Sequence, residues 1–228
     1  MICLSARSPP QQARGVITRA SEAELPVVVL GGGGHARVLI EAMRANGRTI
    51  MGIADPALVP VARGPGGVGV LGGDEVLDKL EANDVLLVNG IGSVGSMAAR
   101  DAIFRRGRER GFRFATVVHA SAVVSPSAQL GEGVQLMAGA IIQCDAAIGA
   151  NSIVNTGACI DHDCRIGESV HIAPGVTLSG SVTVGDRTHI GTAAAVIQGI
   201  SIGCDCLVGA GAVVHRNLPD NGQLVRQR

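Results

Sequence analysis

The chain has 228 residues with no net charge at neutral pH, 33 glycines, three phenylalanines, and neither tryptophan nor tyrosine. Hydrophobic residues make up 46% of it, which excludes a chain that is disordered for want of apolar side chains. The balanced charge argues against a nucleic-acid or anionic-membrane binder, and no apolar run reaches the ~18 residues of a membrane-spanning helix. A core without large rings must be thin and repetitive, which directs the search to internal repeats.

The first 24 residues carry Arg7, Arg14 and Arg19 but no apolar stretch of signal-peptide length. We predict a disordered tail over 1–24. The six cysteines of the chain, at positions 3, 144, 159, 164, 204 and 206, show none of the paired spacings typical of zinc sites or disulfide frameworks. Reduced thiols and a cytoplasmic protein are therefore expected.

Residues 25–117 alternate between strand-like and helix-like segments. In chain order we predict a strand at 27–30, a helix around 38–43, a strand at 49–54, a loop over 56–69, a short helix at 74–80, a strand at 85–88 and a helix at 97–110. Such alternation predicts a parallel sheet covered by helices. About 90 residues make half of a dinucleotide-binding fold, which suits a mononucleotide better than NAD.

A glycine-rich loop follows the first predicted strand. Gly31, Gly33 and Ala36 have the spacing of a phosphate-binding loop, in which backbone N–H groups and a helix N-terminus hold a diphosphate. Asp55 ends the second predicted strand, where a carboxylate accepts a hydrogen bond from a ribose or sugar hydroxyl. His35 within the loop is unusual for an NAD site and indicates a different ligand.

Residues 118–218 follow a six-residue rule. Stepping by six gives 17 consecutive aliphatic residues: Val118, Val124, Leu130, Leu136, Ile142, Ile148, Val154, Ile160, Ile166, Ile172, Leu178, Val184, Ile190, Val196, Ile202, Val208 and Val214. This is the hexapeptide repeat of a parallel β-helix, in which each unit is a short strand and a tight corner. Three units make one triangular coil, so residues 18 apart lie above one another. We predict a C-terminal tail over 219–228.

His162 is the third residue of its six-residue unit and should face outward between Asp161 and Asp163. An imidazole beside a carboxylate is a natural proton acceptor near neutral pH. Gly180 lies one coil above His162, where it leaves room for a ligand and exposes a backbone N–H to act as an oxyanion donor. The alternative is an exposed corner histidine beside acidic residues.

His171 and His189 are also 18 residues apart and should stack on one face. They form a surface ladder, a pair lining a cofactor site, or two zinc ligands. A zinc lyase of the hexapeptide carbonic anhydrase type needs a third convergent histidine, with help across a subunit interface. Cys164 and Cys206 fall at an inward position and should pack in the core, whereas outward-facing Cys159 leaves a covalent acyl-thiol role open.

Three segments together resemble the bacterial sugar acetyltransferases of the sialic acid O-acetyltransferase type. They are 27–41 with its Gly-Gly-Gly-Gly-His run, 155–167 with its Asp-His-Asp, and 171–175. Within that group the chain is most similar to N-acetyltransferases of nucleotide-linked amino sugars such as perosamine. The resemblance covers about 26–219. It implies a Rossmann-like α/β domain over 25–117 that binds the nucleotide sugar, followed by a left-handed parallel β-helix over 118–218.

The resemblance also implies roles for individual residues. His162 is the implied general base, with Asp163 as its carboxylate partner. The implied substrate-binding residues are Gly33, Gly34, His35, Asp55, Gly92 and Asn155, and the implied acetyl-CoA contacts are His171, Gly180, Thr192 and Ala210. A homotrimer with active sites between subunits and a reaction without a metal are implied as well.

We therefore expect an acetyl-CoA-dependent N-acetyltransferase acting on a UDP- or GDP-linked amino sugar in the synthesis of surface glycans such as lipopolysaccharide O-antigen. The amine attacks the thioester directly while His162 removes its proton, and positioning is the main contribution to the rate. Three alternatives stay open: an O-acetyltransferase of a sialic-acid-type sugar, the zinc lyase, and a non-catalytic scaffold that binds nucleotide sugars.

Overall fold

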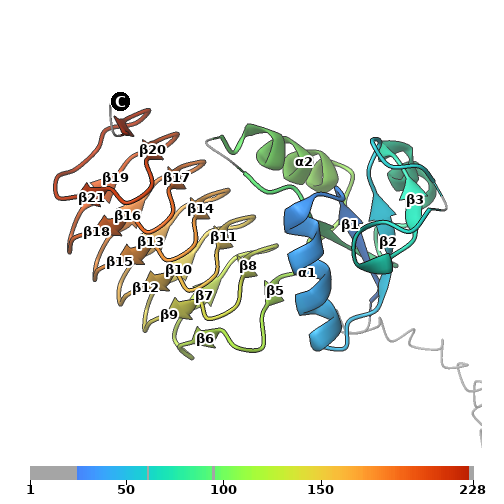
Figure 1. The fold of residues 1–228 in the computed structure, drawn as a ribbon, viewed down its shortest axis with the longest axis horizontal. Coiled ribbons are helices and arrows are strands. Elements are labelled where there is room, and N and C mark those ends of the chain that lie inside the picture. Colours follow the sequence, from blue (N-terminus) through green and yellow to red (C-terminus); the bar gives the residue numbers. More distant parts are fainter. Residues whose placement is uncertain (1–24, 61, 94–95, 226–228) are drawn as a thin grey trace, which may run out of the picture.

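The computed structural model describes residues 25–60, 62–93 and 96–225; the tail predicted over 1–24 lies outside the described residues. The N-terminal part is built on a four-stranded parallel sheet in the order β3-β2-β1-β4 (Figure 1). Its strands are β1 (Val27–Leu30), β2 (Ile50–Ala54), β3 (Val70–Gly72) and β4 (Leu86–Asn89). The parallel order agrees with the expected α/β class.

Two α-helices cover opposite faces of this sheet. Alternate residues of β1 separate its faces: Val27 and Val29 pack with helix α1 (Gly34–Ala45), whereas Val28 and Leu30 pack with helix α2 (Ala98–Glu109). Two short 3₁₀ helices, η1 (Pro65–Gly67) and η2 (Asp74–Lys79), complete the connections.

The sequence predicted most of these elements to within a few residues. The segment predicted as a helix over 74–80 is the 3₁₀ helix η2, and the predicted loop over 56–69 contains η1. Strand β3 was not predicted, because it has only three residues and ends at Gly72, whose φ is 142°. Within the described part of the chain, strand β3 pairs with β2 alone, at the edge of the sheet.

From Val117 onward the chain winds into a parallel β-helix with three flat faces (Figure 1). The seven-stranded face holds β5 (Val117–Val118), β8 (Gln135–Leu136), β11 (Ile153–Val154), β14 (His171–Ile172), β17 (His189–Ile190), β20 (Leu207–Val208) and β22 (Gln223–Leu224). The six-stranded face holds β6 (Val123–Val124), β9 (Ile141–Ile142), β12 (Cys159–Ile160), β15 (Thr177–Leu178), β18 (Ala195–Val196) and β21 (Val213–Val214). The five-stranded face holds β7 (Gln129–Leu130), β10 (Ala147–Ile148), β13 (Arg165–Ile166), β16 (Thr183–Val184) and β19 (Ser201–Ile202).

The hexapeptide pattern accounts for the coil's interior. From β5 to β21 the second residue of each strand is the predicted aliphatic, and facing strands pair residues 18 apart, as in Ile148↔Ile166. The second interior position of each unit holds mostly alanine, cysteine or valine, and Cys164 and Cys206 are buried there, as predicted. The described core of the coil contains no aromatic side chain. A prism this narrow explains the glycine-rich, aromatic-poor composition.

The β-helix continues past residue 218. Strand β22 pairs with β20 in the parallel sense, and Leu207 faces Gln223, a spacing of 16 rather than 18 residues. The predicted tail over 219–228 is therefore wrong for its described part, because a shortened last coil closes the end of the prism. Among the described residues, no helix combines the length and the apolar character needed to cross a membrane.

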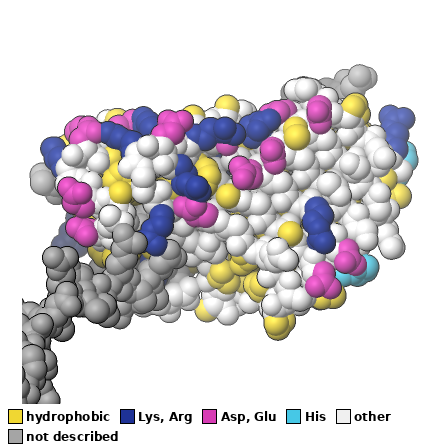
Figure 2. All heavy atoms as spheres, turned by 180° about the vertical axis from the view of Figure 1, so that it is seen from behind, with side chains coloured by type: hydrophobic (Ala, Val, Ile, Leu, Met, Phe, Trp, Pro, Cys, Tyr) yellow, Lys and Arg dark blue, Asp and Glu magenta, His cyan; other side chains and the backbone are white. Residues whose placement is uncertain are grey.

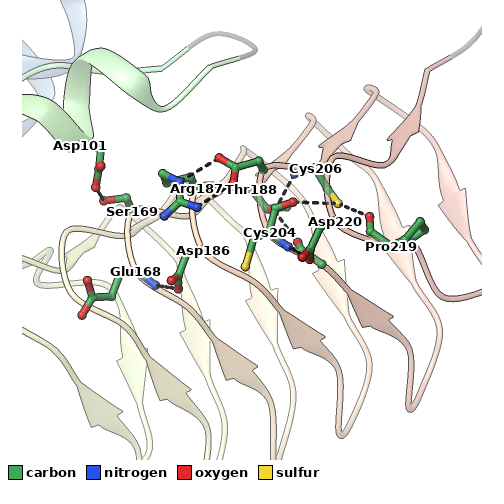
Figure 3. A network of polar contacts seen from close by, with 12 residues as sticks. Asp101, Glu168, Ser169, Asp186, Arg187, Thr188, Cys204, Cys206, Pro219 and Asp220 are labelled. Atoms are coloured by element: carbon green, nitrogen blue, oxygen red, sulfur yellow. Dashed lines mark hydrogen bonds and ion pairs between the residues drawn. The ribbon is translucent and has the colours of Figure 1, made fainter.

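Helix α2 is fixed against the coil at the corner between the five- and seven-stranded faces. Ser169 donates a hydrogen bond to Asp101 at 2.7 Å, and one coil further Arg187 makes a bidentate pair with Asp205 at 2.7 and 2.8 Å (Figure 3). Figure 2 shows positive and negative side chains intermingled along one edge of the molecule on that view. Exposed pairs of this kind contribute little stability each, about 0–1 kcal/mol.

Candidate active site

A pocket of about 480 Å³ lies where the N-terminal sheet meets the coil. Three segments line it: the start of helix α1, the loop after β4, and the corner between the seven- and six-stranded faces. It brings together six residues predicted for the site, namely Gly33, Gly34, His35, Gly92, Asn155 and His171. The N-terminus of α1 has no acidic residue in its first turn, so its free N–H groups favour an anionic ligand.

His35 joins the two halves of the molecule. Its Nε2 lies 2.7 Å from the Oε1 atom of Gln135, which is fully buried on strand β8. Burial, and secondarily the positive charge of Arg100, lowers the pKa of His35 to about 4. His35 is therefore neutral at physiological pH.

Asp55 lies directly after strand β2, at the position that the sequence indicated. It does not line the pocket, and its two oxygens accept hydrogen bonds from the N–H groups of Gly32 at 2.7 Å and Ala57 at 2.8 Å. The carboxylate thus holds the glycine loop in shape. A direct substrate contact by Asp55 stays a prediction.

His171 uses both of its ring nitrogens inside the protein. The Oδ1 atom of Asn155 accepts from the Thr156 N–H, so its Nδ2 donates to His171 Nε2 at 3.1 Å. His171 Nδ1 therefore carries the proton and donates to Ser93 Oγ at 2.6 Å. Burial, with smaller contributions from neighbouring histidines and Arg100, lowers the pKa of His171 to about 3.

The predicted stacking of His171 on His189 is confirmed. The two residues pair across β14 and β17, and their rings meet edge to face with centroids 4.9 Å apart. In the described part of the chain, no group of three or more potential ligands is close enough to hold a metal ion. The pair alone supplies two of the three histidines that a zinc lyase of this class requires.

His162 lies at a different corner, between the six- and five-stranded faces. It is half-exposed, and its Nδ1 lies 2.8 Å from Asp163 Oδ2, while Asp161 caps its backbone N–H at 2.8 Å. The hydrogen bond to Asp163 raises the pKa of His162 above its ordinary value, and the charge of Asp161 adds to this. With Nδ1 held by a carboxylate, Nε2 is the atom left to accept a proton.

Gly180 lies directly against the His162 ring. A Cβ atom at Gly180 would be 2.6 Å from His162 Cε1 and Nε2, so only glycine permits this approach. We expected Gly180 to leave room for a ligand above His162. The imidazole ring itself fills that space, so this expectation is corrected. The Gly180 N–H donates to no described residue, which keeps it available beside Nε2.

One chain does not bring all the predicted residues together. The pocket lies at one edge of the six-stranded face, and His162 lies at its other edge. Thr192 and Ala210 continue the pocket's own corner two and three coils above Thr156, and Ala210 lines a separate cavity of about 460 Å³. Cys159 lies between the two edges, and burial raises the pKa of its thiol, which disfavours a nucleophilic thiolate.

Sequence reasoning missed three residues of this region. Ser93 bonds His171, Gln135 bonds His35, and Arg100 is completely buried beneath the pocket loop, with bonds to the carbonyls of Asn89 and Ile91. Arg100 did leave a signal. It falls on the same side of α2 as the buried residues at positions 104 and 107.

Comparison with known proteins relates this geometry to enzymes. Residues 26–106 match the PglD N-terminal domain. A mutant of perosamine N-acetyltransferase from Caulobacter crescentus, solved with CoA and GDP-perosamine, is 44% identical, with a TM-score of 0.81 over 88% of this chain and 93% of that one. No curated protein sequence matched the chain.

Two further structures have the same architecture. The acetyltransferase domain of PglB from Neisseria gonorrhoeae is 33% identical, with a TM-score of 0.80 over 88% of this chain and 96% of that one. WeeI from Acinetobacter baumannii is 24% identical, covers 89% and 97% of the two chains with a TM-score of 0.78, and supports the fold alone. The β-helix is of the left-handed kind found in these acetyltransferases. The chain therefore belongs to the hexapeptide-repeat sugar acetyltransferases that carry a PglD-type N-terminal domain.

Proposed function

We propose that this enzyme transfers an acetyl group from acetyl-CoA to the amine of a nucleotide-linked amino sugar, with a GDP-linked sugar as the first candidate. The observation that carries this proposal is the similarity, over nearly the whole chain, to an enzyme solved with CoA and GDP-perosamine. Two features of the pocket support it. The N-terminus of helix α1 has no acidic residue nearby and can therefore bind a diphosphate, and the neutral polar side chains of the lining can bind a sugar.

We propose His162 as the general base. The sugar amine, as its free base, forms the new N–C bond at the thioester carbonyl, and the C–S bond then breaks to release CoA. His162 Nε2 takes the amine proton and passes it to the departing thiolate. Asp163 fixes the tautomer and supports the developing imidazolium, and the Gly180 N–H, which donates to no described residue, is available to the thioester oxygen.

A second copy of the chain completes the site in this proposal. The pocket and His162 occupy the two edges of the six-stranded face, so a neighbour that covers this face brings its own His162 to the pocket. Outward residues of the face suit such a contact, since Val123 and Val213 are 62% and 58% exposed. We propose a trimer, for which sedimentation should give three times the 23.1 kDa chain mass.

We propose that each of the two domains binds one of the two substrates. Residues 25–117 bind the nucleotide sugar, 118–225 form the acetyl-transfer coil, and Thr192 and Ala210 border the CoA arm along the pocket's corner. We place the reaction in the cytoplasm, in the synthesis of surface glycans, because nucleotide sugars and acetyl-CoA are made there.

The direct test incubates the purified chain with acetyl-CoA and GDP-perosamine, or with UDP- and dTDP-linked amino sugars, and follows thiol release. Treating the product with hydroxylamine separates an amide, which resists it, from an ester, which it cleaves. An amide product supports N-acetylation. An ester would favour O-acetylation, and the absence of thiol release with every amino sugar would reject the proposal.

The general base is tested by His162→Ala, which should lower kcat at least about 100-fold with little change in folding. Cys144→Ala is the matched control, because Cys144 occupies the same exposed corner position one coil below. Turnover near that of the wild type in His162→Ala would remove His162 from the mechanism.

A further inference from the structure

The contact between His35 and Gln135 joins the two halves of the molecule, and it also determines which ring nitrogen of His35 carries the proton. A neutral imidazole has one N–H donor and one bare nitrogen, and which is which depends on the partner of each atom. His35 Nε2 lies 2.7 Å from an amide oxygen. An amide oxygen has no proton to donate, so in this amide orientation Nε2 carries the proton.

The amide orientation of Gln135 is set by its other end. Its Nε2 donates to the backbone carbonyl of Asn89 at 2.9 Å, and that same carbonyl accepts from Arg100 Nη1 at 3.0 Å. Turning the amide over would set the Gln135 oxygen against the Asn89 carbonyl oxygen, with no proton between them. Gln135 is fully buried, so no solvent is present to compensate that repulsion.

The residues around Asn89 form a buried hydrogen-bond network. Arg100 also donates to the carbonyls of Ile91 and Asn151 at 2.7 and 2.9 Å, and the Asn89 side chain donates to Asn151 Oδ1 at 3.1 Å. All these groups are buried or nearly so. The carbonyl that orients Gln135 is therefore held in place from both halves of the molecule.

The remaining atom of the ring, His35 Nδ1, is unoccupied by protein. No described residue hydrogen-bonds to it, and it is not among the buried, unpartnered side-chain atoms of the described chain, so it is open to solvent. Because His35 lines the 480 Å³ pocket, we infer that this bare nitrogen faces the pocket. The lone pair of His35 Nδ1 can accept a hydrogen bond, so the pocket favours a ligand with an O–H or N–H donor at this point.

We propose that Gln135 is a positioning residue that holds His35 as the Nε2–H tautomer, and that His35 Nδ1 selects substrates by accepting a hydrogen bond from a hydroxyl or amine N–H of the bound sugar nucleotide. The identity of the ligand rests on the proposed function, whereas the tautomer of His35 is argued from the hydrogen bonds alone. An analogue that lacks the donor leaves Nδ1 unpaired and binds more weakly.

The first experiment reads the tautomer directly. The full-length protein, labelled with ¹⁵N-histidine, is examined at pH 7 by long-range ¹H–¹⁵N correlation, and the spectrum of His35→Asn assigns the His35 signals. We expect a protonated Nε2 and a bare Nδ1 in the free protein. On addition of GDP-perosamine, the Nδ1 resonance should move toward the hydrogen-bonded range while Nε2 stays in place.

The second experiment removes the positioning group. Gln135→Met keeps the side chain's length but no longer accepts from Nε2, so Nδ1 should become partly protonated in the same spectrum. KM for GDP-perosamine should rise about 10-fold while kcat stays within about threefold, the expected cost of one lost hydrogen bond. Gln129→Met, on the exposed side of β7, is the control and should leave both values unchanged.

A protonated Nδ1 in the free wild type would overturn the tautomer assignment. An Nδ1 signal unmoved by saturating GDP-perosamine, or an unchanged KM in Gln135→Met, would overturn the selection role. If GDP-perosamine neither binds nor is acetylated, the proposed substrate fails, and the free-protein spectrum still decides the tautomer. A merely structural role for Gln135 predicts lower thermal stability with KM and the tautomer unchanged.

Discussion

Asp163 adopts a left-handed backbone conformation, with φ of 60°, and this tight turn places its carboxylate 2.8 Å from His162 Nδ1. Because that hydrogen bond raises the pKa of His162, Asp163→Asn should lower it and move the rising limb of kcat/KM to lower pH. The plateau should fall about 10-fold, since the base is weaker and less well oriented. A pH–rate profile measures both effects. Asp145→Asn, one coil below, should match the wild type, and an unmoved limb in Asp163→Asn would contradict this assignment.

Gly180 is the second residue whose identity the site dictates. A methyl group there would lie 2.6 Å from the His162 ring and would force the imidazole to tilt away. Gly180→Ala should therefore lower kcat about 100-fold, the usual cost of displacing a catalytic group by about 1 Å. Gly69→Ala is a matched control, because its added Cβ meets open space. A fully active Gly180→Ala would show that the close approach is unnecessary.

Among the elements, the coil strands were the most predictable, because a six-residue period fixes strand, corner and interior at once. Gln135 shows where the period stops being informative. As the first residue of β8 it points away from the coil interior, yet it is fully buried, because the N-terminal half covers the seven-stranded face. Ser93 and Arg100 likewise bond to the coil only because the N-terminal half packs on it. No local sequence pattern shows which face of the coil another domain will cover.

The inward aliphatic of each coil strand should carry the stability of the coil. Ile160 is completely buried in the prism, so Ile160→Ala should lower the free energy of unfolding by about 2–5 kcal/mol. Thr183→Ala, at the exposed first position of strand β16 on the five-stranded face, should change it by less than about 0.5 kcal/mol. Urea unfolding at a fixed protein concentration compares the two. Equal effects would mean that the prism interior relaxes to fill the cavity.

At the scale of the whole molecule, the sequence predicted two halves and their classes but not the surface between them. That surface is polar: a buried arginine, two asparagines and a glutamine join β4 and α2 to the coil. Polar residues at outward positions give no sign of burial in a sequence. This explains why the corner that carries His162 could be predicted from a motif, whereas the polar residues buried beneath the pocket could not.

Histidines buried at this surface between the two halves make the folded state sensitive to acid. His35 and His171 stay neutral in the folded protein, with pKa values of about 4 and about 3, whereas the unfolded chain protonates both near pH 6.5. The unfolded state therefore binds more protons below pH 6.5, and stability should fall by up to about 1.4 kcal/mol per pH unit for each histidine. The fall should run from about pH 6.5 to pH 4, with the contribution of His171 continuing below that. Half-exposed His162, whose pKa is raised, opposes this only weakly. Urea unfolding at pH 7.5, 6.0 and 5.0 should show a shallower dependence of stability on pH for His171→Asn than for the wild type; equal slopes in the two proteins would mean that folding does not lower the pKa of His171.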